Sequence, residues 1–167
     1  YAGDALTTGA NNVAIGHYAL SAATTAASNT MVGGWAGDVI TTGGSNVGIG
    51  QHALGALTTV SNLVAVGTGA LVANTTGVRQ TAVGYNALAT VTTNGTNTAV
   101  GYESLKLNTG YSNTAVGGYS LDTNSSGNYN TAVGDSALTA NTTASNNTAV
   151  GASAAAAVTT GANNTAM

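Results

Sequence analysis

Small and apolar residues recur along the chain at a fixed interval and define one repeated unit. A motif of the type Asn-Thr-Ala-Val-Gly returns with constant spacing, and only the interval from Gly101 to Gly117 is shorter, by a single position. The glycines of this column are Gly16, Gly33, Gly50, Gly67, Gly84, Gly101, Gly117, Gly134 and Gly151. Self-similarity at a fixed period is the signature of repeat and solenoid proteins.

The three residues before each glycine alternate in type and predict a short strand. The residue just before the glycine is Val or Ile, the next one back is Ala in most copies, and the third is Thr or Val. Neighbouring residues of a strand point to opposite faces. We expect the Val/Ile column to face inward, with Val83, Val100 and Val116 buried, and the Ala column to face outward. In the alternative arrangement, Ala fills a narrow interior and Thr and Val face out.

A Leu column four residues after the glycine predicts a second strand inside the same unit. Its members are Leu20, Leu54, Leu71, Leu88, Leu105, Leu121 and Leu138. Gly37 and Ala155 interrupt the column, but Ile40 and Val158, three residues further on, could replace the missing side chains. A Thr pair and then Gly, Asn, Ser and Ala follow, which is a turn composition.

Stacking of units is required, because one unit cannot bury its own apolar face. We therefore predict an all-β fold, a parallel β-solenoid (β-roll) of about ten 17-residue rungs, where a rung is one coil of the chain. Residues 1–167 form a single repeat domain. Because the sequence starts and stops inside a repeat, we expect it to be a segment of a longer array.

The composition narrows the functional classes. Charged residues make up 4% of the chain, and Arg79 and Lys106 are the two cations. Without a basic patch we expect no nucleic-acid partner, and no apolar run is long enough for a membrane span. Cysteine is absent, so disulfide, zinc and thiol chemistry are not expected. The scarcity of trypsin sites favours an extracellular location.

The repeats resemble the head repeats of trimeric autotransporter adhesins, the YadA-like β-roll. The matching segments are Asn12–Gly16, Asn46–Gly50 and Val64–Gly67, and Thr81–Leu88 is also similar to repeats of phage tail-fibre-like proteins. The resemblance implies a left-handed homotrimer exposed on a cell surface or virion fibre, which binds host matrix or other cells. We therefore expect a structural and adhesive fibre segment, assembled as a homo-oligomer (a trimer) or a filament.

Two columns are candidate surfaces for such contacts. The candidate contact surface is aromatic and consists of Tyr18, Trp35, Tyr85, Tyr102 and Tyr119. The candidate inter-chain strip is the Ala column, represented by Ala65, Ala82, Ala99, Ala115 and Ala132. Lateral packing between chains is an alternative role for the aromatic residues.

No residue set predicts a catalytic, cofactor-binding or metal site. His17 and His52 occupy different columns two rungs apart, so we do not expect them to share a metal. Asp4 and Asp38 share a column two rungs apart, but Ser21 lies between them and no general acid is evident. We therefore expect no enzymatic activity.

The Thr pairs suggest an alternative function, a monomeric ice-binding or carbohydrate-binding solenoid. If each pair lies in a strand, at most one Thr per rung faces outward, so a two-column array is not expected and the hydroxyls would bond to neighbouring backbone. Asn-x-Ser/Thr sequons begin at Asn74, Asn94, Asn124, Asn141, Asn146 and Asn163.

Overall fold

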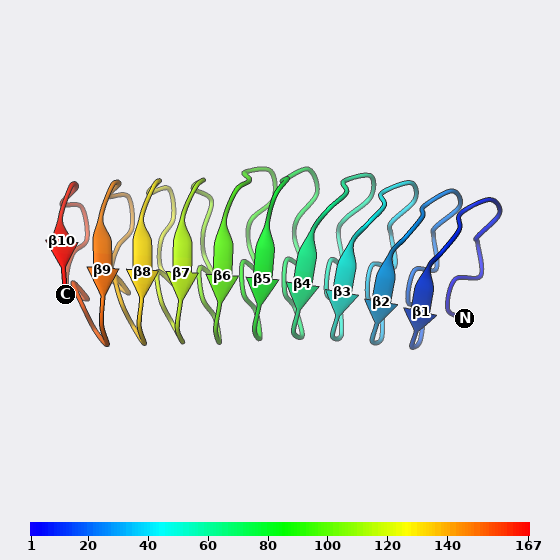
Figure 1. Ribbon diagram of the computed structural model, residues 1–167, viewed down its shortest axis with the longest axis horizontal. Helices are drawn as coiled ribbons and strands as arrows, with labels where there is room; N and C mark the ends of the chain where they lie inside the picture. The colour runs from blue at the N-terminus through cyan, green and yellow to red at the C-terminus, as the bar shows by residue number, and fades with distance from the viewer.

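One short strand from each repeat contributes to a single parallel sheet that runs the length of the molecule (Figure 1). The computed structural model describes residues 1–167, and it contains no helix. The strands are β1 (Val13–Ile15), β2 (Thr30–Val32), β3 (Val47–Ile49), β4 (Val64–Val66), β5 (Thr81–Val83), β6 (Thr98–Val100), β7 (Thr114–Val116), β8 (Thr131–Val133), β9 (Thr148–Val150) and β10 (Thr165–Ala166). Ten strands in sequence order make about nine turns, which confirms the predicted parallel β-solenoid.

Each strand pairs with the next at the repeat period of the sequence. In β5 and β6, Ala82 lies opposite Ala99, its equivalent in the following repeat, so residues of one type stack along the rod. The shorter repeat falls between β6 and β7, where Thr98 still lies opposite its equivalent, Thr114. The residue missing from this interval therefore lies in a turn, and the strand columns stay aligned through it.

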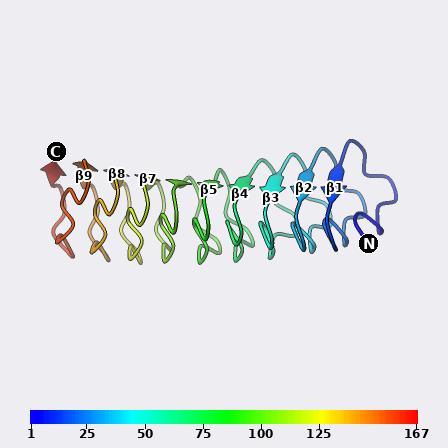
Figure 2. The ribbon, with the colours of Figure 1, turned by 90° about the horizontal axis from the view of Figure 1, so that it is seen from below.

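The wall opposite the sheet is a stack of turns, so the predicted second strand is wrong (Figure 2). Leu88 has a φ of 51° and Asn86 a φ of 50°, in the left-handed region that strands do not use. The N–H of Ala87 closes a turn by donating to the carbonyl of Gly84 at 3.3 Å. The N–H of Leu88 still donates to the next rung, to the carbonyl of Ser104 at 3.1 Å.

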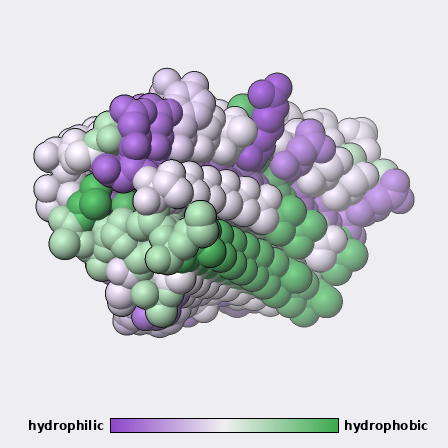
Figure 3. All heavy atoms as spheres, turned by 60° about the vertical axis from the view of Figure 1, so that its left-hand side comes forward, coloured by the Kyte–Doolittle hydropathy of each residue, from purple (hydrophilic) through white to green (hydrophobic).

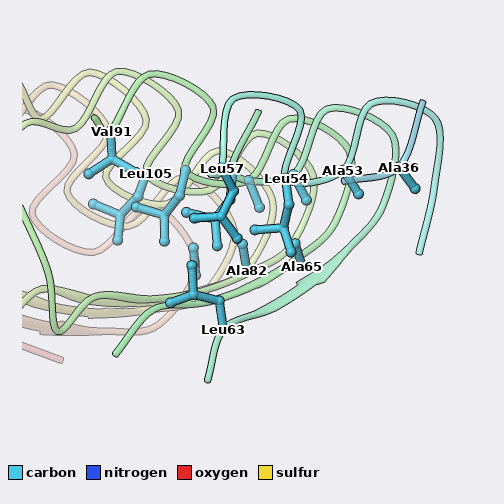
Figure 4. Packing of buried hydrophobic residues seen from close by; sticks show 14 of the residues in the cluster. Ala36, Ala53, Leu54, Leu57, Leu63, Ala65, Ala82, Val91 and Leu105 are labelled. Carbon is cyan, nitrogen blue, oxygen red and sulfur yellow. The ribbon is translucent and has the colours of Figure 1, made fainter. Parts of the chain in front are cut away.

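The interior is a narrow column of Ala and Leu side chains (Figure 4). The Leu column is fully buried, as predicted. The inward Val column is wrong: Val83 and Val100 are partly exposed and Val116 is 37% exposed, whereas Ala82 and Ala99 between them are fully buried. The stacked turns place Leu side chains so close to the sheet that only a methyl group fits opposite them. The arrangement with Ala inside and Val outside is therefore the observed one.

One rung demonstrates how closely the interior is filled. In β2, Met31 takes the place of the inward Ala, and Gly37 takes the place of the Leu on the opposite wall. A Cβ on Gly37 would lie 2.8 Å from the Met31 sulfur, and a Cβ on Gly48 in β3 would lie 2.5 Å from it. The large side chain thus enters from the sheet and small residues surround it, which preserves core packing density. Ile40 is also fully buried, in agreement with its expected substitution for Leu.

A ladder of buried amides runs beside the Ala column. Asn130 Oδ1 accepts the backbone N–H of Asn147 at 3.0 Å, and Asn130 Nδ2 donates to the carbonyl of Ala144 at 2.8 Å. These bonds supply partners for backbone groups of the broad turn that would otherwise be buried unpaired. Leu63 replaces Asn in one rung and interrupts the ladder, whereas Gln80 in the next rung keeps the equivalent side-chain bond, to the carbonyl of Asn94 at 2.7 Å.

Candidate functional site

The expected inter-chain strip lies inside the coil. Its members are all fully buried: Ala65, Ala82, Ala99, Ala115 and Ala132. They contact the Leu column of their own chain and belong to its core cluster. The assignment of this strip to contacts between chains is therefore wrong, because its methyl groups are already covered within one chain.

The outward face of the sheet, where the Ala column was expected, carries an apolar stripe of Val and Ile. We define the apolar stripe as Ile15, Val32, Ile49, Val66, Val83, Val100, Val116, Val133 and Val150. Exposure of its members reaches 60% at Ile15 and 45% at Val150. A band of hydrophobic residues along one side of the rod is visible in Figure 3. Sheet faces in contact with water usually carry polar residues, so this stripe is a candidate interface.

The aromatic column divides into two separate groups, and the first surrounds Trp35. The ring of Trp35 stacks on His52 with centroids 5.2 Å apart and an interplanar angle of 9°. His17 meets Trp35 edge-on at 5.1 Å, and Tyr18 lies 6.5 Å away at 29°. The indole of Trp35 therefore lies between the two imidazoles and keeps His17 and His52 apart. No group of three or more His, Cys, Asp or Glu residues is arranged to hold a metal ion.

The second group is a ladder of three tyrosines from successive rungs. Tyr85 and Tyr102 stack with centroids 5.1 Å apart, and Tyr102 and Tyr119 lie 5.3 Å apart. Shielding from water raises the pKa of the Tyr102 hydroxyl, and the carboxylate of Glu103 adds to this effect. Tyr85 and Tyr102 are nearly parallel and cover each other's faces, with an interplanar angle of 21°, whereas the ring of Tyr119 is tilted by 59° from that of Tyr102.

A third aromatic pair was not expected from the sequence. Tyr111 and Tyr129 meet edge to face, with ring centroids 5.2 Å apart. A hydrogen bond with Tyr111 raises the pKa of the Tyr129 hydroxyl. Their separation along the chain exceeds the repeat by one position, so they fall in adjacent columns and a search by column misses them.

The Thr pairs form an exposed corner of the coil, which we call the threonine corner. Its first column is Thr7, Thr24, Thr41, Thr58, Thr75, Thr92, Thr109, Ser125, Thr142 and Thr159. Its second column is Thr8, Thr25, Thr42, Thr59, Thr76, Thr93, Ser126, Thr143 and Thr160. Every member of the second column is exposed, and eight of the ten in the first are exposed as well. The expectation of one outward Thr per rung is wrong, because the pairs lie at bends and not in strands.

The remaining polar candidates do not come together in a site. Ser21 and Ala22 lie in the rung between Asp4 and Asp38. The Ala22 N–H and the Ser21 hydroxyl both donate hydrogen bonds to the backbone carbonyl of Asp38. Burial raises the pKa of the Asp38 carboxyl, against a smaller opposing effect of His52. The structure contains no pocket.

The Asn-x-Ser/Thr sequons differ in exposure. The Asn side chains are buried at Asn74, Asn124 and Asn141, and they are exposed at Asn94, Asn146 and Asn163.

Two further observations complete the description. No helix in the structure is long and apolar enough to cross a bilayer. Comparisons with protein-family models, with curated proteins and with solved structures find no match to this chain.

Proposed function

We propose that this chain is a structural and adhesive segment of a fibre exposed on a cell or virion surface, and that it is not an enzyme. The observation that carries the proposal is the apolar stripe, a row of exposed and partly exposed Val and Ile side chains that extends from β1 to β9. Contiguous exposed apolar surface of this kind is characteristic of protein interfaces. We infer that the occupant of the stripe is a second copy of the chain.

Three properties of the stripe favour self-association. Its side chains repeat in register with the rungs, so two copies present matching rows to each other. The neighbouring outward column is Thr or Val and contains no charge. With 4% charged residues in the whole chain, electrostatic repulsion between copies is weak.

Three copies around a common axis are the arrangement that the resemblance to YadA-like heads implies. Each chain has one such stripe, so a closed ring of copies would bury every stripe and leave none to recruit further chains. A left-handed coil belongs to the same proposal. It is supported by Figure 1, where the strands run downward while the chain advances from right to left, and by Figure 2, where the strands lie on the side of the coil that faces the viewer in Figure 1.

Native mass measurement tests the assembly. Val83→Lys together with Val100→Lys places two charges in the stripe, and we expect this variant to be a folded monomer where the wild type is a trimer. The matched control is Val39→Lys together with Leu107→Lys, two exposed apolar residues outside the stripe, and it should remain a trimer. A wild type that is monomeric at high concentration would contradict the proposal.

The adhesive role is assigned to the aromatic groups around Trp35 and Tyr102, which lie beyond the strand ends. In a stripe-centred oligomer these corners would lie at the sides of the assembly, available to a ligand on a host surface or in its matrix. Replacement of Tyr85, Tyr102 and Tyr119 by Ser should reduce binding to matrix-coated plates without a change in native mass. Unchanged binding would remove the adhesive part of the proposal and leave the structural part intact.

A further inference from the structure

The threonine corner combines a regular array of side chains with free hydroxyl groups. In its second column, Thr42, Thr59, Thr76 and Thr93 are exposed in four successive rungs. None of their hydroxyl groups has a hydrogen-bond partner within the protein, in contrast to most of the first column. The corner therefore presents a row of unpaired hydroxyl groups and methyl groups to solvent.

Hydrogen bonds of the first column tie several pairs of successive rungs together at the corner. The Thr7 hydroxyl donates to the carbonyl of Thr24 at 2.9 Å, and the Thr75 hydroxyl donates to the carbonyl of Thr92 at 3.1 Å. The same carbonyl of Thr92 accepts the backbone N–H of Thr75 at 2.9 Å, so these two rungs are tied twice at this corner. Equivalent hydroxyl bonds are made by Thr24, Thr41 and Thr142 but not by Thr58 or Thr92. Each contact fixes the rotamer of the first-column Thr that makes it, a side chain that is already stiff at χ1. The second-column side chains make no such bond, but they are β-branched and follow this backbone directly, so their conformational freedom is limited and little entropy is lost when a partner binds them.

The geometry of the array restricts the kind of partner. Successive rungs of a parallel sheet are about 4.8 Å apart, which is close to the spacing of oxygen atoms along the basal plane of ice. No charged residue lies in either column, and six consecutive rungs from Thr7-Thr8 to Thr92-Thr93 carry the complete Thr pair. A partner with its own short, fixed repeat fits this corner better than a single small molecule, because there is no pocket.

We propose that the threonine corner binds the surface of ice. Its hydroxyl groups would hydrogen-bond water molecules at lattice positions, while the methyl groups between them order the adjacent water. Sugar polymers are the less favoured partner, since they usually stack on open aromatic faces and the rings of Tyr85 and Tyr102 cover each other. This proposal does not depend on the fibre function, because the threonine corner and the apolar stripe occupy different positions of the coil.

Ice-affinity partition and recrystallisation assays test the proposal directly. The wild-type chain, labelled at its N-terminus, should enter a slowly growing ice front and keep ice grains small. Thr59→Lys together with Thr76→Lys should abolish both effects without altering the circular dichroism spectrum or the native mass. Thr68→Lys together with Thr90→Lys adds the same charge at exposed positions outside the corner, and it should retain both effects.

Conservative variants separate the contributions of the two groups on each Thr. Thr59→Ser with Thr76→Ser retains the hydroxyl groups, Thr59→Val with Thr76→Val retains the methyl groups, and both should weaken ice binding if the mixed array is the ligand surface. Wild-type protein that is excluded from ice as completely as the Lys variant would overturn the proposal. So would binding of the wild type to insoluble chitin or cellulose that the Lys variant loses while neither protein binds ice, because the corner would then be a carbohydrate site.

Discussion

Gly84 and Gly101 approach each other so closely that a Cβ on Gly84 would lie 2.1 Å from the carbonyl oxygen of Gly101. Gly84 also has a φ of 140°, in the region that L side chains rarely adopt. The same contact joins Gly101 to Gly117, where a Cβ would lie 2.3 Å from the carbonyl oxygen. The glycine column is therefore required by the stacking of one rung on the next, and not by the turn alone.

Gly101→Ala should destabilise the rod severely. We expect a loss above about 3 kcal/mol, the upper end for a strained backbone position alone, because the two rungs must also move apart. Gly34→Ala is the control: its nearest neighbour would be the His17 carbonyl at 4.0 Å, and we expect a change within about 1 kcal/mol. Urea unfolding followed by circular dichroism measures both. Equal effects of the two substitutions would refute the close contact.

Removal of one amide from the buried ladder should be costly even when the replacement is apolar and similar in size. Asn130→Leu leaves the backbone N–H of Asn147 without its partner and removes one of the two amide donors to the carbonyl of Ala144, the other being Asn141 Nδ2. A buried unpaired group costs about 1–3 kcal/mol, and we expect a loss of at least this size in urea unfolding. Asn128→Ala, at a partly exposed position, should cost less because water can replace its bond to the Tyr111 N–H.

The inward direction of the strand side chains can be tested with adjacent residues of β6. Ala99→Asp places a carboxylate in the fully buried column, and an uncompensated buried charge costs about 3–5 kcal/mol. Val100→Asp places the same group on the outer face, where we expect a change of about 0.5 kcal/mol in the single chain. Thermal unfolding compares the two variants. A larger effect at Val100 than at Ala99 would reverse the assignment of inside and outside.

The stability of the rod should respond to pH through Asp38. Burial raises the pKa of this carboxyl above its ordinary value of 3.8, so the fold favours the protonated form. The resulting stability is fully present below pH 3.8 and is lost as the pH rises through the raised value in the folded state. Asp38→Asn should therefore melt at a higher temperature than wild type at pH 7, and at the same temperature at pH 3. A gain of equal size at both pH values would exclude the titration of Asp38 as its cause.

The period and the strand positions of this fold follow directly from the sequence, whereas the side of the strand that faces inward does not. Alternation in β6 shows that Ala99 and Val100 point in opposite directions, but hydrophobicity alone assigns the larger Val to the interior. The width of the interior decides otherwise, and it is set by the turns of the opposite wall. Those turns depend on left-handed φ values at residues such as Leu88, which are uncommon for Leu and carry no sequence signal.

The narrow interior also explains why the expected surfaces differ from the observed ones. The Ala column and the apolar stripe exchange roles together, because both belong to the same strands. A strand would present only one Thr of each pair to solvent, because adjacent residues of a strand point apart. Thr58 and Thr59 instead lie at a bend, and both are exposed. The repeat register alone predicts that the aromatic residues of one column lie close together, whereas the ring orientations, such as the stacking of Tyr85 on Tyr102, depend on the geometry of the turns.

The rung that lacks one residue has a practical consequence. Thr109 is followed directly by Gly110, with no second Thr between them, and β6 and β7 nevertheless pair without loss of register. Chain length at this corner is thus independent of the packing inside the coil. A foreign peptide grafted between Thr109 and Gly110, or at the same corner of several rungs, would be displayed at intervals set by the backbone itself. The rod is in this sense a scaffold on which antigenic loops can be arrayed at a chosen spacing.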